Sequence, residues 1–180
     1  RWRRAGRRST RLLCDTKRPD VVSDVSRRLA NPRRRLNALR RALPALQVSV
    51  PEGEDGLYRI QQVPGPPRPC TALFRGPVYE CIASDSPADC AAYLEAAQRV
   101  QAPGARSILI LGLGLGIVVQ AALKNPAVES VTAVEIAPEV VRLVSPSYSS
   151  DPRFRVVTAD AMEWAPPADV CYDVVWIDIW

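Results

Sequence analysis

Residues 108–116, which read ILILGLGLG, constrain the fold more than any other part of the chain. A short apolar run of this kind is typical of a buried strand. It runs directly into Gly112, Gly114 and Gly116, and the helix-like stretch IVVQAALK follows. Glycines let the chain turn tightly and let a ligand approach the backbone, while a helix N-terminus offers free N–H groups. The pattern therefore predicts a strand, a tight turn and a helix that together form a nucleotide-binding corner.

Acidic residues end the later apolar runs at regular intervals. Glu135 follows VTAV, Asp160 follows FRVVTA, and Asp178 comes at the end of DVVWID. In an open parallel sheet, ligands bind at the carboxyl ends of the strands, where the strand order reverses. The three acids and the glycine corner are therefore expected to face one crevice.

The spacing of two of these acids indicates what each could hold. Glu135 follows Gly112 by 23 positions, close to the offset of about 20 at which an acid binds a ribose diol. Asp160 could accept a hydrogen bond from an adenine amino group, with the backbone N–H of Ala161 beside it. The alternatives are that Glu135 only caps the next helix and that Asp160 is an ordinary loop acid.

From residue 107 onward, strands and helices alternate. The expected strands are 108–112, 131–135, 154–158 and 173–178, and the expected helices are 115–124 and 138–145. Strands this apolar, joined by helices, indicate a parallel sheet covered on both faces. The predicted fold class is thus α/β, with a Rossmann-like, doubly wound, mainly parallel sheet in a domain spanning 85–180.

The first half of the chain predicts two further parts. Short β-like runs separated by Pro and Gly fill residues 48–82 and predict a small β-rich subdomain over 47–84. A helix is expected over residues 85–101, capped by Asp85 or Ser86, with Pro87 in its first turn. Residues 1–46 are expected to form a basic arm, disordered or helical, with an amphipathic helix or pair of helices over 20–43 that is interrupted at Asn31 and Pro32.

The charge of the chain is divided unequally. Residues 1–44 hold 15 Lys and Arg against 3 Asp, whereas residues 45–180 hold 9 basic against 16 acidic residues. The arm could thus make a weak nucleic-acid contact, or it could simply be a solvated segment. The acidic remainder argues against a nucleic-acid reader in the core.

Composition excludes several other classes of protein. No apolar run approaches the roughly 18 residues of a membrane span, and no signal peptide is visible, so we expect no membrane contact and a cytoplasmic location. The five cysteines include no C-x-x-C pair and the chain has no histidine, which argues against a metal site and against histidine-based proton transfer. The chain begins at Arg1 and has one methionine, Met162, so we expect a fragment of a longer protein.

The glycine spacing separates two kinds of nucleotide-binding corner. Nicotinamide enzymes use G-x-G-x-x-G, which requires glycine at position 117, where this chain has Ile117. The G-x-G-x-G spacing with acids after strands two, three and four resembles the class I S-adenosylmethionine-dependent methyltransferases. The strings NPAVESVTAVEIAPEVVRL, DPRFRVVTADAMEW and YDVVWIDIW resemble the spermidine-synthase-like branch of that superfamily.

The resemblance implies a cofactor, S-adenosyl-L-methionine, and a role for each site residue. It also implies the strand order 3-2-1-4 for the part of the sheet that is visible. The implied cofactor contacts are Gly112, Gly114 and Gly116 for the methionine part, Glu135 for the ribose, and Asp160 with Ala161 for adenine. Ile136, which follows Glu135, is a further expected cofactor contact. Asp178 is the implied catalytic residue, which would orient or deprotonate the acceptor.

One departure from the branch bears on the reaction. Aminopropyltransferases resemble one another in a G-G-G-x-G-G loop that contains an acid, and this chain has Leu113 and Leu115 instead. Methyl transfer to an acceptor that the sequence does not reveal is therefore the first hypothesis, and aminopropyl transfer to a polyamine is the second. The third is a non-catalytic Rossmann-like binding module whose basic arm binds nucleic acid.

Residues 173–180 are expected to form an apolar strand edge with free backbone N–H and C=O groups. We therefore expect the chain as written to self-associate, to bind cofactor poorly and to lack activity. A homodimer is the other form of association that we consider.

Overall fold

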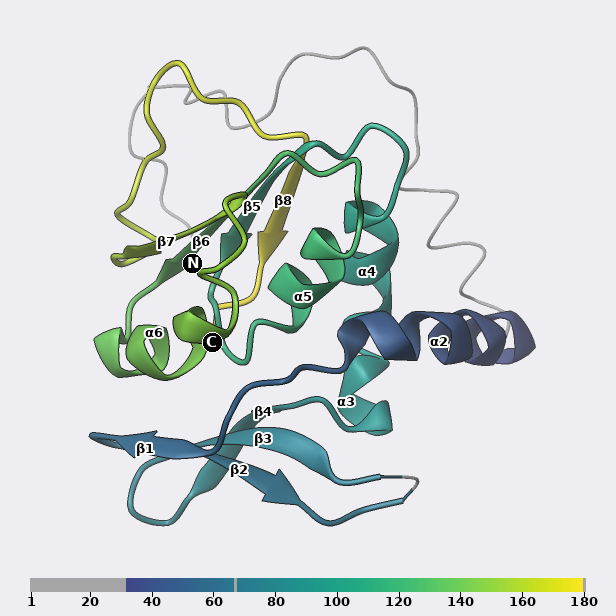
Figure 1. The fold of residues 1–180 in the computed structure, drawn as a ribbon, viewed down its shortest axis with the longest axis vertical. Coiled ribbons are helices and arrows are strands. Elements are labelled where there is room, and N and C mark those ends of the chain that lie inside the picture. The colour runs from purple at the N-terminus through teal and green to yellow at the C-terminus, as the bar shows by residue number, and fades with distance from the viewer. Residues whose placement is uncertain (1–31, 67, 180) are drawn as a thin grey trace, which may run out of the picture.

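A computed structural model describes residues 32–66 and 68–179 of the chain. These residues form two four-stranded sheets and the helices that pack around them. Figure 1 shows the antiparallel sheet below the parallel one. The proposed helical segment before Asn31 lies outside the described residues.

The small β-rich part is an antiparallel sheet of four strands in sequence order. They are β1 (Gly53–Asp55), β2 (Tyr58–Val63), β3 (Cys70–Arg75) and β4 (Glu80–Ser84). Each strand pairs with its chain neighbour, and a register shift between Leu73 and Phe74 bends the β3–β4 pair. The β-like runs predicted over 48–82 are confirmed from residue 53 onward, whereas residues 48–52 form no strand.

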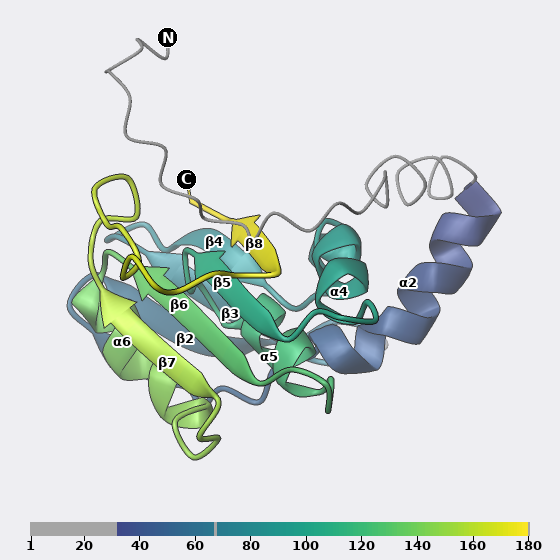
Figure 2. The ribbon, with the colours of Figure 1, turned by 90° about the horizontal axis from the view of Figure 1, so that it is seen from above.

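The second sheet is entirely parallel. It contains β5 (Ser107–Leu111), β6 (Ser130–Glu135), β7 (Phe154–Thr158) and β8 (Val174–Ile177). The spatial order is β7-β6-β5-β8, which is 3-2-1-4 when the four strands are numbered along the chain. Figure 2 shows these four strands side by side, with the antiparallel sheet behind them. The parallel α/β architecture expected from the sequence is confirmed.

Among the described residues, helices cover one face of the parallel sheet. Ile108 and Ile110 of β5 pack with Val119 and other residues of the main core, to which α4 (Leu94–Val100), α5 (Ile117–Leu123) and α6 (Pro138–Val144) contribute. Leu109 points to the opposite face and packs with Tyr172 and with partly buried residues of the β7–β8 connection. The prediction of two covered faces is confirmed for the helical face. On the second face the described residues supply only this connection, and Leu111, Val157 and Val175 are only partly buried there.

The helix predicted over 85–101 is wrong in one respect, because the structure breaks it in two. The first piece, α3 (Pro87–Cys90), has Ser86 as its N-cap, whose side chain accepts the Asp89 N–H at 3.2 Å. The backbone N–H groups of residues 91–93 bond to carbonyls three positions back, so the chain tightens into a turn before α4. Asp85 does not cap this helix. Its buried carboxylate accepts hydrogen bonds from the backbone N–H groups of Val48 and Thr71 and forms an ion pair with Arg68.

The basic segment is helical where it is described. Helix α2 (Pro32–Leu46) begins at the proline where the sequence predicted an interruption, and its N-terminal part projects from the body (Figure 2). Its C-terminal end does not project, because Leu46 is fully buried and Leu43 packs against the main core. In residues 32–66 and 68–179, no helix is both long and apolar enough to cross a membrane.

Candidate functional site

A cavity of about 610 Å³ lies between the two sheets, at the carboxyl ends of the parallel strands. This volume is within the range of small-molecule sites. Its wall on the parallel side contains Gly112, Gly114, Glu135, Ile136, Asp160, Ala161 and Asp178. The structure therefore brings together all the residues that the sequence proposed for the site except Gly116, which lies outside the cavity lining.

The three glycines of the turn serve different ends. All three have positive φ, at 98° for Gly112, 49° for Gly114 and 74° for Gly116, a region that residues with a Cβ rarely adopt. A Cβ on Gly112 would overlap the carbonyl oxygen of Asp178, and one on Gly116 would overlap the ring of Tyr148. A Cβ on Gly114 would meet no atom within 4 Å. Gly112 and Gly116 are thus required by packing, whereas Gly114 opens onto free space in the cavity.

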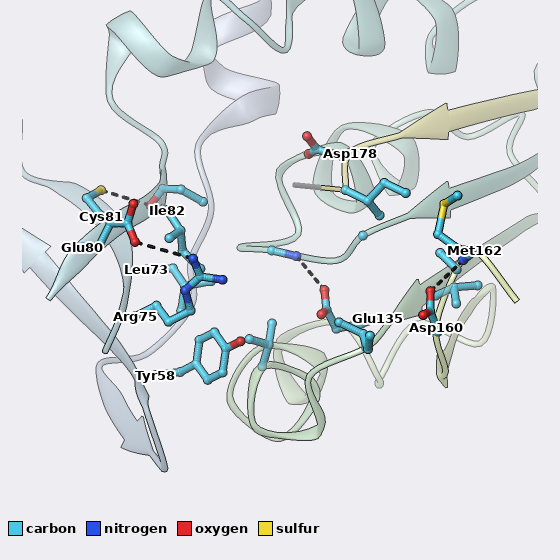
Figure 3. A pocket seen from close by; sticks show the side chains of 18 of the residues that line it. Tyr58, Leu73, Arg75, Glu80, Cys81, Ile82, Glu135, Asp160, Met162 and Asp178 are labelled. Carbon is cyan, nitrogen blue, oxygen red and sulfur yellow. Dashed lines mark hydrogen bonds and ion pairs between the residues drawn. The ribbon is translucent and has the colours of Figure 1, made fainter. Parts of the chain in front are cut away.

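The side chain of Glu135, at the end of β6, is hydrogen-bonded to the backbone of the glycine turn (Figure 3). Its Oε2 accepts the backbone N–H of Leu113 at 2.8 Å and that of Gly114 at 3.4 Å, and its Oε1 accepts the Ala137 N–H at 3.0 Å. A carboxylate has about four acceptor positions, so both oxygens keep capacity for the hydroxyls of a ligand. The Ala137 contact also supplies a partner at the start of α6, where Ala137 itself has no capping side chain.

The adenine side of the proposed site is formed by the chain after β7. The Oδ1 of Asp160 accepts the Met162 N–H at 2.8 Å, which folds residues 160–162 into a turn. Met162 and Ile136 line the same cavity and are 62% and 64% exposed. Exposed apolar side chains at a cavity wall are suited to contact the faces of a flat ring.

Asp178 is paired with a residue that the sequence did not reveal. Tyr93 lies in the turn between α3 and α4 and lines the cavity. Burial raises the pKa of Tyr93, and so does the nearby charge of Asp178. Tyr93 therefore stays protonated at neutral pH beside the carboxylate. No sequence signal marked it, since it falls inside a stretch that the pattern assigned to one continuous helix.

The antiparallel sheet supplies the opposite wall of the cavity. Its contributions include Tyr58, Arg75, Glu80, Cys81 and Ile82 (Figure 3). Sequence reasoning missed this wall because nothing local to β2–β4 shows which sheet they will face.

The first hairpin of that sheet is fixed to α6. Arg142 donates to both carboxylate oxygens of Asp55, at 2.6 and 3.2 Å. The hydrogen bond from Arg142 holds the pKa of Asp55 below its usual value. The pair joins the two sides of the cavity at a point outside its lining.

Within the described part of the chain, no group of three or more Cys, Asp or Glu side chains is placed to hold a metal ion. The described cysteines are all free thiols.

Comparisons with known proteins identify the fold. No protein-family model matches the chain. The chain is 39% identical over 84 residues to polyamine aminopropyltransferase 2 of Ralstonia nicotianae, and 36% identical over 88 residues to the polyamine aminopropyltransferase of Mycobacterium tuberculosis. The fold is of the class I methyltransferase type and spermidine-synthase-like. The resemblance proposed from the sequence is thereby confirmed.

These matches are partial. Each covers 42% of this chain and 16% of the relative, so the chain spans about a sixth of the length of the proteins it matches. Among solved structures, the spermidine synthase of Thermotoga maritima is 20% identical with a TM-score of 0.47, covering 71% of this chain and 47% of that one. Coclaurine N-methyltransferase is 18% identical with a TM-score of 0.42, covering 86% of this chain and 46% of that one.

Proposed function

We propose that this spermidine-synthase-like domain binds S-adenosylmethionine and belongs to a methyltransferase. The observation that carries the proposal is the cavity between the two sheets, where the glycine turn, Glu135, Asp160 and Asp178 line one space. Each of these residues lies at the carboxyl end of a parallel strand, the place where sheets of this kind bind nucleotides.

The residues present fit this cofactor. The free space above Gly114 accepts a chain that runs against the backbone. Glu135 offers carboxylate oxygens to the ribose hydroxyls, and Asp160 with the Ala161 N–H offers an acceptor and a donor to the adenine edge. The apolar side chains of Ile136 and Met162 offer surfaces to the ring. Glu135 supports the turn as well, so the same carboxylate would position both the loop and the ligand.

Catalysis by such a site consists mainly of alignment. When bound, S-adenosylmethionine carries its own leaving group on a sulfonium centre. The protein has to hold an acceptor in line with the methyl group and to exclude water. Asp178 is the proposed catalytic residue, because its carboxylate can orient the acceptor and take a proton from it. Tyr93 is the proposed positioning residue, because its protonated phenol lines the same cavity as Asp178 and can donate to that carboxylate.

Aminopropyl transfer to a polyamine is the second candidate. The sequence similarity to polyamine aminopropyltransferases favours it, and an acidic cavity suits a cationic substrate. Against it, the glycine turn carries no acid: Leu113 and Leu115 are 4% and 1% exposed and belong to the core. The two candidates differ in whether the cofactor carries a carboxylate, so ligand binding can separate them.

The test is isothermal titration calorimetry of the full-length protein with S-adenosylmethionine, decarboxylated S-adenosylmethionine and NAD. We expect S-adenosylmethionine to bind most tightly. Preference for the decarboxylated form would favour the second candidate, and preference for NAD would contradict both. Binding of none of the three would support a non-catalytic module, for which the basic segment is the proposed nucleic-acid contact.

A further inference from the structure

Arg75 is a cation in the cavity that the proposed contacts leave unused. It ends β3 on the antiparallel wall and is the only basic residue among the described residues that line the space. The other charged lining residues are Glu80, Glu135, Asp160 and Asp178. A single cation placed among acids indicates a site for a specific anionic group.

The existing partner of Arg75 does not use up its donors. Glu80 lies directly opposite it in the β3–β4 register, and the closest approach is 3.5 Å from Nη2 to Oε2. That distance exceeds a normal hydrogen bond, and both side chains are about half exposed or more, at 49% and 66%. A guanidinium has five N–H donors in a planar fork, so Arg75 can bind a carboxylate in two-point fashion while staying close to Glu80.

The order of residues across the cavity matches the order of groups in the proposed cofactor. In Figure 3, Asp160 and Met162 lie at one end, Glu135 lies between, and Arg75 and Glu80 lie at the other. If adenine lies at Asp160 and ribose at Glu135, the amino-acid tail extends past the glycine turn towards Arg75. The tail is a zwitterion, and the Arg75–Glu80 pair offers the opposite charge for each of its ends.

We propose that Arg75 binds the α-carboxylate of the methionine part of S-adenosylmethionine and makes the site select the carboxylated cofactor over its decarboxylated form. Glu80 accepts from the α-ammonium group, the task for which the glycine turn has no acid. This inference rests on the proposed function and deepens it. It also makes the antiparallel sheet, rather than the glycine turn, the part that chooses between methyl and aminopropyl donors.

The experiment measures the affinity of the full-length protein for three probes by calorimetry: S-adenosylmethionine, its decarboxylated form and 5′-methylthioadenosine, which has no amino-acid tail. The variants are Arg75→Gln and Glu80→Gln. The matched control is Arg59→Gln, because Arg59 lies on the neighbouring strand of the same sheet, pairs with Glu54 and does not line the cavity. Circular dichroism and thermal unfolding establish that each variant is folded.

We expect Arg75→Gln to lower the affinity for S-adenosylmethionine by about tenfold or more, as for loss of a charge-assisted bidentate contact. The affinity of this variant for 5′-methylthioadenosine should stay within about twofold of wild type. The variant should no longer prefer S-adenosylmethionine over the decarboxylated form. Glu80→Gln should lower the affinity for the decarboxylated form more than the affinity for 5′-methylthioadenosine. Arg59→Gln should leave all three affinities unchanged.

Three outcomes would overturn the inference. Equal loss of all three probes in Arg75→Gln would show a merely structural role. Unchanged S-adenosylmethionine affinity in a folded Arg75→Gln would show that the cation serves another anion, such as a carboxylate of the acceptor. If 5′-methylthioadenosine and S-adenosylmethionine both fail to bind the wild-type chain, the proposed function itself falls, and the inference falls with it.

Discussion

The carboxylate of Glu135 accepts a hydrogen bond from the backbone nitrogen of Leu113 at 2.8 Å, which links the end of β6 to the glycine turn after β5. The bond joins two residues 22 positions apart. It gives the acid a second task beside the proposed one of holding a ribose. Substitutions at Glu135 can separate the two tasks.

Glu135→Ala should weaken S-adenosylmethionine binding by about 1.5 to 3 kcal/mol, the usual scale for hydrogen bonds to a charged group. Glu135→Gln should lose less, because an amide oxygen can still accept the Leu113 N–H while the charge is lost. Calorimetry measures both. Glu129→Ala serves as the control, since Glu129 is an exposed acid paired with Arg106 outside the cavity lining. An Ala variant that binds as tightly as wild type would remove Glu135 from the site.

Gly116→Ala should destabilise the fold. The residue has φ of 74° and its Cβ would overlap the Tyr148 ring, which is buried and hydrogen-bonded to the Leu115 carbonyl. The left-handed conformation alone costs about 1–2 kcal/mol for a residue with a Cβ, and the overlap adds to this. Urea unfolding monitored by circular dichroism measures the decrease in the free energy of unfolding. A midpoint equal to that of wild type would show that Tyr148 moves aside freely and that the turn adapts.

Gly114→Val should affect binding more than folding. Its Cβ would enter open space, so apart from the strain of positive φ nothing in the protein opposes it. The space it would fill is the part of the cavity assigned to the methionine tail, and S-adenosylmethionine affinity should therefore fall sharply. The prediction fails if this variant binds normally, in which case the loop is only a turn.

The local pattern of the sequence was sufficient for the parallel sheet. β7 begins and ends at the residues predicted, 154 and 158. β6 begins one residue early, and β5 and β8 each differ from the prediction by one residue at both ends. Apolar runs that end in glycine, proline or acid encode these limits locally. The carboxyl ends of such strands converge by topology, which is why residues as distant in sequence as Gly112 and Asp178 could be assigned to one crevice.

The rest of the site depends on contacts between distant segments. Tyr93 reaches Asp178 because the chain tightens between α3 and α4, and a continuous helical pattern hid that turn. Arg75 lines the cavity because the antiparallel sheet packs beside the parallel one. That arrangement involves the Asp55–Arg142 pair, whose members are 87 positions apart. Neither periodicity nor composition carries such information.

The Asp55–Arg142 pair predicts a pH dependence. Arg142 lowers the folded-state pKa of the Asp55 carboxyl below its ordinary value of 3.8. The pair therefore contributes to the stability of the fold above that pH. The contribution is lost as the pH falls through the lower folded-state pKa. Asp55→Asn should therefore lower the melting temperature at pH 7, and the difference from wild type should shrink below about pH 4 and vanish in stronger acid. A difference that stays constant across this range would mean that the lost contact is steric and not ionic.

The basic N-terminal segment gives the last prediction. The charge count assigns any nucleic-acid binding to residues 1–44, but the structure changes the variant that should be made. Ala42 and Leu43 of α2 pack against the main core, so deleting all of residues 1–44 would remove core packing as well as charge. The better pair is deletion of residues 1–31 and substitution by Gln of every arginine that remains in the segment, namely Arg33, Arg34, Arg35, Arg40 and Arg41.

Each change should reduce retention on a heparin column, and the two together should abolish it, because binding to a polyanion depends on the number of cations that displace counterions. The wild-type retention should fall steeply with salt. Affinity for S-adenosylmethionine should stay within error in every variant, since none of these residues lines the cavity. If retention survived the combined variant, the binding surface would have to lie on residues 45–180, where acidic side chains outnumber basic ones, and the proposed role of the segment would be refuted.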